Sequence, residues 1–333
     1  MTRKKFYKGF LPMSNFPFID LHEDLQSHLD HLDLFLHGKQ TDFSLLEQAG
    51  AKLVVATAFP LPPRDDFFDP ATDALIEREF EAYRHHVQTD PRWRLVRDAE
   101  DLRAVLAAPD ARGLLLHVEG LNVMDERNFE KLERWHAMGW RSLGPVWNLS
   151  NPLGGGTNDP ARGLTPLGAR VIDWLAQKRM VLDFAHMNRP TFWDAAGRWR
   201  GPIYASHAGA AALRPSPRNL DDAQLRAAGE SGGAVGIFFA NRFLAPEGAR
   251  GGVGLVADHL LHVVRVAGAE AAALGTDLGG VLSGLVDGLP SVDRVAALWD
   301  ELAGRGCADD LIEKIAWRNA ARALEEMLAI PSP

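Results

Sequence analysis

Short apolar runs alternate with longer stretches of helical pattern along most of the chain. Eight of these runs have the length and β-prone composition of buried strands; they are Phe18–Leu21, Leu53–Phe59, Gly113–Glu119, Arg141–Trp147, Met180–His186, Pro202–His207, Ala234–Ala240 and Ala271–Asp277. Mixed charged and apolar spacing predicts helices between and after them, at Asp73–Val87, Asn128–Met138, Thr165–Lys178, Asp221–Glu230, Val256–Ala267, Ser291–Ala303 and Asp309–Leu328. The chain is therefore predicted to be of the α/β class.

Strands that are each followed by a helix indicate a closed parallel barrel, so we expect a (β/α)8 TIM barrel. An open doubly wound sheet is the alternative, but no GxGxxG motif follows the first run. We expect residues 18–328 to form this one catalytic domain and residues 1–17 to be an N-terminal extension.

Composition narrows the classes of partner and the cellular location. The 333 residues carry a formal net charge of −8, which argues against nucleic acid as a partner. No run approaches the roughly 18 apolar residues that span a bilayer, and residues 1–18 lack the pattern of a secretion signal. Cys307 is the only cysteine, which fits a reducing compartment. We therefore expect a cytoplasmic protein without a membrane partner.

Histidines and carboxylates gather at the ends of five of the predicted strands. In an extended chain, residues two apart point to the same side, so His22 and Asp24 share a face. The other four ends place these groups at Glu119, His186, His207 and Asp277. All lie at C-terminal ends, where barrel enzymes build their active sites, and unrelated core positions would not favour one end.

This set of residues predicts a metal site. His22, Asp24, Glu119, His186 and His207 offer nitrogen and oxygen ligands that suit zinc, with manganese, cobalt or iron as alternatives. Glu119 follows a long apolar run, where an unpaired carboxylate is expensive to bury, so it suits a ligand that bridges two cations. Taken singly, the His22–Asp24 pair would fit a solvated loop and Glu119 a salt bridge. The barrel is therefore expected to be of the metal-dependent hydrolase type.

Other histidines have more ordinary interpretations. His117 lies deeper on the same strand face as Glu119 and is expected to be a hydrogen-bonded core residue. Asp20 precedes His22 by two residues and is expected to hold it in place. His28 is expected to face solvent, and His259 and His262 to lie on a helix surface or an interface.

Several short motifs, in order from about residue 18 to 328, resemble those of the membrane (renal) dipeptidases and their bacterial relatives. Ile19–Leu25 is similar to that family's IDGHNDL, and Val118–Gly120 to its VEG. Further matches are Gly163–Gly168 to GLTPFG, Asp183–His186 to D-L-[SA]-H, Ala205–His207 to the SHS segment, Arg218–Asp222 to RN-x-x-D and Gly275–Gly280 to G-x-D-F-D-G.

The resemblance implies a (β/α)8 barrel with a binuclear zinc site. By position, His22, Asp24 and Glu119 would hold one Zn2+, and Glu119, His186 and His207 the other. Arg218 would bind the carboxylate of the substrate, and Asp277 would transfer the proton. The resemblance also suggests a homodimer.

The chain departs from the vertebrate members of this family at two places. Trp147 stands where they have a histidine thought to contact the tetrahedral intermediate, and Gly279 replaces the second aspartate of G-x-D-F-D-G. An indole N–H donates one hydrogen bond but cannot become cationic. Trp147 and the adjacent Asn148 are therefore expected to contact the substrate, with a changed substrate range or rate.

Together these features predict a zinc-dependent dipeptidase that attacks the peptide bond with a hydroxide bridging two metals, with Glu119 and Asp277 as catalytic residues. One alternative is a related binuclear metal amidohydrolase acting on lactams, lactones or N-acyl amino acids. Those enzymes often carry an HxH pair on the first strand and a bridging lysine. Here the pair is HxD and Glu119 is the candidate bridge, which disfavours that group. Another alternative is a catalytically idle metal-binding homologue, favoured by Trp147 and opposed by the complete ligand set.

Overall fold

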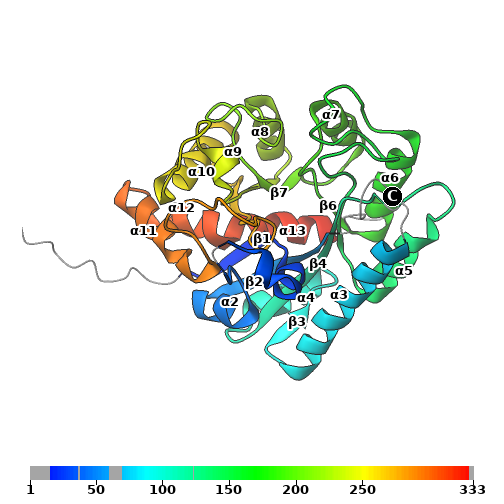
Figure 1. Cartoon of the computed structure of the whole chain (residues 1–333), viewed down its shortest axis with the longest axis horizontal. Coiled ribbons are helices and arrows are strands. Elements are labelled where there is room, and N and C mark those ends of the chain that lie inside the picture. The colour runs from blue at the N-terminus through cyan, green and yellow to red at the C-terminus, as the bar shows by residue number, and fades with distance from the viewer. Residues whose placement is uncertain (1–15, 37, 60–69, 123, 330–333) are drawn as a thin grey trace, which may run out of the picture.

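A computed structural model of the chain describes residues 16–36, 38–59, 70–122 and 124–329, and places parallel strands inside a ring of helices (Figure 1). The barrel strands are β1 (Phe18–Glu23), β2 (Ala51–Ala58), β4 (Arg112–Glu119), β5 (Ser142–Gly144), β6 (Val181–Leu182), β7 (Tyr204–Ala208), β8 (Ala234–Ile237) and β9 (Ala272–Leu274). They are hydrogen-bonded in the order β6-β5-β4-β2-β1-β9-β8-β7, and a parallel bridge between Asp183 and Tyr204 joins the two ends. The predicted (β/α)8 barrel is confirmed.

Helices cover the outside of the barrel. They are α1 (Leu25–Asp30), α2 (Phe43–Ala49), α3 (Pro70–Thr89), α4 (Ala99–Ala107), α5 (Glu130–Met138), α6 (Pro166–Lys178), α7 (Arg189–Arg198), α8 (Asp222–Glu230), α9 (Asn241–Leu244), α10 (Val253–Ala267), α11 (Ala296–Gly304), α12 (Asp309–Glu313) and α13 (Asn319–Ala329). None of the helices in the described part of the chain has both the length and the apolar character needed to cross a membrane. The predicted N-terminal extension lies outside the described residues except for positions 16 and 17.

Side-chain caps set the start of the helices that the sequence predicted best. The hydroxyl of Thr165 accepts a hydrogen bond from the Gly168 amide, and Pro166 occupies the first turn of α6. At α8, Asp221 and Gln224 form a reciprocal capping box. These local signals explain why the predicted helix starts agree closely with the structure.

The segment between β2 and β4 was predicted only in part: the helix expected at Asp73–Val87 is α3 (Pro70–Thr89), but two further elements were missed. It contains a ninth short strand, β3 (Trp93–Leu95), which pairs with the first half of β4, whereas β5 pairs with the second half. It also contains α4, which is capped by the carboxylate of Asp98. A strand of three residues is too short to show a hydrophobic period, so the sequence pattern did not reveal it.

The C-terminal helix α13 closes the N-terminal end of the barrel. Arg322 donates hydrogen bonds to the carbonyl oxygens of Gly232, Gly233 and Glu270, which lie just before β8 and β9. Figure 1 shows α13, in red, running across the strands. The predicted continuous helix at Asp309–Leu328 is interrupted by a π-helical segment at Lys314–Arg318. The histidines and carboxylates at the C-terminal ends of the strands lie at the opposite end of the barrel.

Three histidines are buried, of which His28 was expected to face solvent and His259 and His262 to lie on a helix surface or at an interface. His28 accepts a hydrogen bond from the Gln40 amide, and His259 accepts one from the Ala210 amide. Burial lowers the pKa of both imidazoles to about 4, so both are neutral at pH 7. His262 is also buried and lies 2.7 Å from a carboxylate oxygen of Asp222. The expectation of solvent exposure was wrong for His28, because the segment that contains Gln40 covers it.

Asn319 fastens α13 to the barrel and provides a test of this packing. Its side-chain amide donates to the carbonyl oxygens of Ala269 and Ala272, both at 2.8 Å. Asn319→Ala removes both donors from a buried site, so the free energy of unfolding should fall by about 2–3 kcal/mol in denaturant titrations. Gln177→Ala, which changes an exposed amide on α6, is the control and should alter it by less than about 0.5 kcal/mol. Equal losses would contradict the fastening role.

Candidate metal centre

The structure brings all five predicted metal ligands to the C-terminal end of the barrel. His22, Glu119 and His207 belong to β1, β4 and β7, close to the ends of these strands. Asp24 follows β1 directly, and His186 lies in the loop after β6. Parallel strands in a closed barrel end at one rim, which is why residues so distant in the chain meet here.

The contacts among these side chains centre on one oxygen atom of Glu119. Its Oε1 lies 2.8 Å from His186 Nε2, 3.4 Å from His207 Nε2 and 3.7 Å from His22 Nε2. His22 Nε2 is also 3.7 Å from Asp24 Oδ2. Two groups of potential ligand atoms, each within 4.8 Å, result: one from His22, Asp24 and Glu119, the other from Glu119, His186 and His207. Glu119 belongs to both groups.

Hydrogen bonds orient two of the histidines so that their Nε2 atoms point to Glu119. His186 Nδ1 lies 2.8 Å from Asn148 Oδ1, an acceptor, and therefore carries the proton. His207 Nδ1 lies 2.8 Å from the Ser206 hydroxyl, which itself donates to Asp183. Both Nε2 atoms thus keep a lone pair for a metal ion. Asn148 contacts a candidate ligand, and its predicted contact with substrate stays a prediction.

Carboxylates crowd this buried space. Burial raises the pKa of Glu119 to about 8 and that of Asp277 to about 7, and the Asp24 carboxylate adds to both shifts. Burial alone would lower the pKa of His22, but the charges of Glu119 and Asp24 raise it to about 10. Among the described residues, Asp24 Oδ1 and Glu119 Oε1 are buried and take part in no hydrogen bond. Cations at this position would relieve both the repulsion and the unsatisfied oxygens, so the residues fit a metal site.

Two residues of the rim adopt a strained backbone conformation. His186 has a φ of 64° and Asp277 a φ of 60°, in the left-handed region that costs a non-glycine residue about 1–2 kcal/mol. Among the described residues, Arg179 at the end of α6 is the only other non-glycine residue in this region. Strain at two of the candidate site residues indicates that the surrounding structure imposes their orientation.

Gly280 allows two carboxylates to approach each other. A β-carbon at this position would collide with the carboxylate oxygens of both Asp24 and Asp277. Glycine is therefore required here because a side chain would not fit, and not because the backbone adopts a left-handed conformation. The sequence showed this residue only as the last glycine of a motif.

Asp20 and His117 lie deeper in the barrel than the candidate ligands, on β1 and β4. Asp20 accepts hydrogen bonds from the Thr276 amide at 2.8 Å, the Thr276 hydroxyl at 2.6 Å and the His22 amide at 3.2 Å. It therefore holds the backbone of His22 rather than its imidazole ring, and links β1 to β9. His117 is fully buried, and its Nδ1 lies 2.7 Å from the Ser142 hydroxyl. This placement agrees with a core role.

A small cavity of about 70 Å³ opens above the ligand cluster. It is lined by Asp24, Phe59, Glu119, Trp147, Asn148, His186, His207, Arg218, Arg242, Phe243, Asp277 and Gly280. Arg218 is 6% exposed, donates to the His207 carbonyl at 3.2 Å and forms no ion pair with any described residue. Because an unpaired buried cation is unfavourable, Arg218 is suited to bind an anion that enters the cavity.

Aromatic side chains form the wall of the cavity beside the ligands. The ring centroid of Trp147 lies 4.8 Å from that of Phe59 and 5.9 Å from that of His186. Sequence reasoning missed Phe59, Arg242 and Phe243 as cavity residues. Their position relative to the predicted strands could have indicated this role. Phe59 ends one predicted strand and Arg242 follows another by two residues, so both are expected near the rim that carries the site.

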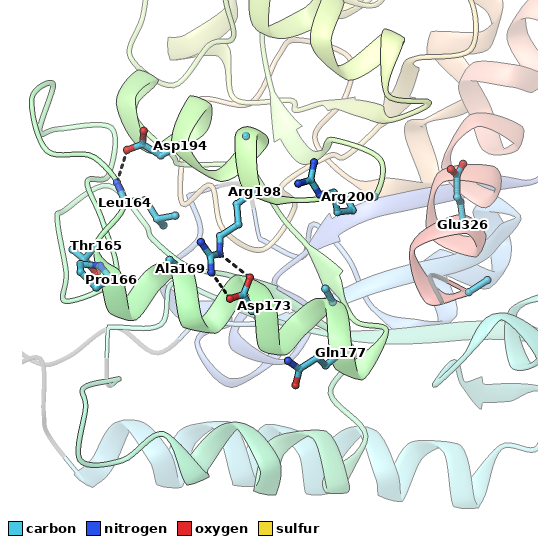
Figure 2. A pocket seen from close by; sticks show the side chains of 14 residues that line it. Leu164, Thr165, Pro166, Ala169, Asp173, Gln177, Asp194, Arg198, Arg200 and Glu326 are labelled. Atoms are coloured by element: carbon cyan, nitrogen blue, oxygen red, sulfur yellow. Dashed lines mark hydrogen bonds and ion pairs between the residues drawn. The ribbon is translucent and has the colours of Figure 1, made fainter. Parts of the chain in front are cut away.

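A larger hollow, of about 1250 Å³, lies away from the ligand cluster (Figure 2). It is a groove beside α6 and α7 that reaches Glu326 and Ala329 of α13, at the closed end of the barrel. Arg198 and Asp173 form an ion pair across it, and neither histidine nor cysteine lines it. Its size therefore does not make it the functional site.

Comparison with known proteins gives a family match that spans almost the whole chain. Residues 12–331 match the family described as Membrane dipeptidase (Peptidase family M19). An uncharacterized protein from the pqqA 5′ region of Klebsiella pneumoniae is 34% identical over 251 residues, which cover 70% of this chain and 92% of that protein. An uncharacterized dipeptidase of Schizosaccharomyces pombe is 29% identical over 67% of this chain and 55% of its own length.

Two solved structures share the complete fold. A metallopeptidase of family M19, described as a dipeptidase, superimposes with a TM-score of 0.83 at 25% identity, covering 95% of this chain and 99% of its own. A Rhodobacter sphaeroides metallopeptidase, crystallised with a phosphinate mimic of the dipeptide L-Ala-D-Ala, gives 0.81 at 25% identity, covering 94% and 99%. The predicted resemblance is confirmed: the chain belongs to the membrane dipeptidase family, peptidase family M19.

Proposed function

We propose that this hydrolase cleaves the peptide bond of dipeptides with two Zn2+ ions held at the barrel rim. His22, Asp24 and Glu119 would hold one ion, and Glu119, His186 and His207 the other. The observation that carries the proposal is the position of Glu119 Oε1, which is buried, lacks a hydrogen bond and faces three imidazole nitrogens. One carboxylate shared by two ligand groups supports a pair of ions.

The donor set supports zinc over harder cations. Three imidazole nitrogens and two carboxylates match the ligands that zinc prefers, whereas calcium and magnesium take mostly oxygen. Zinc ions bound here would activate a water molecule near neutral pH and polarise the scissile carbonyl group.

Arg218 is proposed to bind the C-terminal carboxylate of the dipeptide. Its guanidinium group lines the same cavity as the candidate ligands, is almost completely buried and forms no ion pair among the described residues. A bidentate pair between guanidinium and carboxylate would orient the substrate.

Asp277 is proposed to accept a proton from the attacking water and to pass it to the leaving amine. It lines the cavity, and its carboxylate belongs to a group with His22 and His207 whose potential ligand atoms lie within 4.8 Å. Its left-handed backbone holds the side chain at the rim. Trp147 and Asn148 line the cavity on the side of His186 and are proposed to contact the substrate. The cytoplasmic location and the homodimer also stay proposals.

Metal removal tests the proposal directly. Protein treated with a chelator should lose dipeptide hydrolysis and regain it as zinc is added, reaching a maximum near two equivalents of bound metal. The thermal unfolding temperature should rise over the same titration, because zinc binds the folded state. N-acyl amino acids serve as the control substrates. Retained activity without metal, saturation at one equivalent, or faster cleavage of the N-acyl amino acids would contradict the assignment.

Asp277→Asn keeps the size of the side chain but removes its basic oxygen. The turnover number should fall at least about a hundredfold, since a positioned general base contributes about that much or more. Bound zinc, measured by elemental analysis, should stay near the wild-type content. Asp173→Asn, on the exposed face of α6, is the matched control and should leave the turnover number unchanged. An unaltered rate in Asp277→Asn would remove this residue from the mechanism.

Gly280→Ala places a methyl group between the carboxylates of Asp24 and Asp277. We expect zinc affinity to fall by about tenfold or more, as seen when residues supporting a metal site are altered. Competition with a chromogenic chelator measures this affinity. Gly197→Ala is the control, because a β-carbon there meets no atom within 4 Å. Equal zinc affinity in the two variants would contradict the prediction, because the Asp24 and Asp277 carboxylates would then accommodate the methyl group without loss of metal binding.

A further inference from the structure

Arg242 is a second arginine at the mouth of the cavity, and its backbone is firmly held. It belongs to the short helix α9 that follows β8. The preceding residue, Asn241, donates its amide to the Gly284 carbonyl at 2.9 Å. The Asn241 side chain accepts from the Gly251 amide and donates to the Ala249 carbonyl, both at 2.8 Å. These bonds fix the position from which the Arg242 side chain extends.

The guanidinium group of Arg242 lies over an aromatic ring and has no acidic partner among the described residues. It is exposed, and its Cζ lies 4.5 Å above the centre of the Phe243 ring. Among the residues that the structure describes, Arg242 forms neither an ion pair nor a side-chain hydrogen bond, although most exposed arginines of the chain do. Arg218 and Arg242 line the same cavity of about 70 Å³, together with Asp277. Both arginines therefore act on the same small space.

A dipeptide without charged side chains has a single carboxylate group. Arg218, buried beside His207, is the arginine suited to bind that group. This leaves the exposed Arg242 without a partner in the part of the chain that the structure describes. A second carboxylate on the substrate would provide one, and the exposed position gives the guanidinium group the freedom to reach a side chain of either residue.

We infer that Arg242 gives the enzyme a preference for dipeptides that contain an aspartate or glutamate side chain. The inference rests on the proposed function and names the substrate class of that site. The preference comes from charge pairing at the edge of the cavity, whereas Arg218 serves every dipeptide.

The experiment compares charged and neutral dipeptides of the same shape on the zinc-loaded enzyme. The kcat/KM values of Ala-Asp and Ala-Asn, and of Asp-Ala and Asn-Ala, give two preference ratios, each measured with both enantiomers of the C-terminal residue. In the wild-type enzyme at least one ratio should favour the acidic dipeptide by about tenfold, as expected for one charge pair at a partly exposed site. That ratio should decline as salt is raised from 0.05 to 0.5 M, because salt screens such a pair.

Substitutions then assign the preference to Arg242. Arg242→Gln should reduce the ratio to near one, and Arg242→Lys, which keeps the charge, should retain part of it. Arg294→Gln removes an exposed arginine that does not line the cavity and should leave both ratios unchanged. Bound zinc is measured for each variant, so that lost metal is not mistaken for lost preference.

The outcomes separate this inference from the proposed function. Efficient hydrolysis of neutral dipeptides with wild-type ratios near one would overturn the inference and leave the dipeptidase proposal standing. A wild-type preference that survives in Arg242→Gln would also overturn it, because another group would then be responsible. Failure to hydrolyse any dipeptide with two zinc equivalents bound would overturn the proposed function and the preference together.

Discussion

The convergence of three imidazole nitrogens on one buried oxygen atom of Glu119 is the constraint on which this structure depends. Without a cation, the carboxylates of Asp24, Glu119 and Asp277 disfavour one another's charged forms. Asp24 and Glu119 are buried, and Asp277 is partly exposed at the rim. Such an arrangement is unfavourable by itself, because buried charges need partners. Binding of divalent ions would turn the same repulsion into ligand affinity.

The barrel supplies the rigidity that holds this unfavourable cluster together. The Asp277 amide donates to the His22 carbonyl at 3.0 Å, and the Asp24 amide donates to the Leu278 carbonyl at 2.9 Å, so the ends of β1 and β9 are joined at the ligands themselves. Asp20 joins the same two strands one layer deeper. With the strands fixed on both levels, the left-handed backbone of Asp277 can be maintained.

The sequence predicted what depends on local pattern and on strand direction. Apolar runs located the barrel strands, and the rule that parallel strands end at one rim predicted that His22, Glu119 and His207 lie together. Features created by tertiary contact were not predictable. The burial of His28, the strain at His186 and the space kept open by Gly280 depend on which atoms arrive from distant parts of the chain.

Trp147 shows how a departure from the family pattern changes the cavity. The tryptophan packs between Phe59 and His186, where the resemblance implied a histidine that can carry a charge. An indole ring offers one hydrogen-bond donor and a broad apolar surface, so this wall provides packing rather than positive charge. The guanidinium groups that line the cavity belong to Arg218 and Arg242, on the segments that follow β7 and β8. Among the described residues of the cavity, the cationic guanidinium groups therefore lie on these two segments, whereas the Trp147 wall is aromatic.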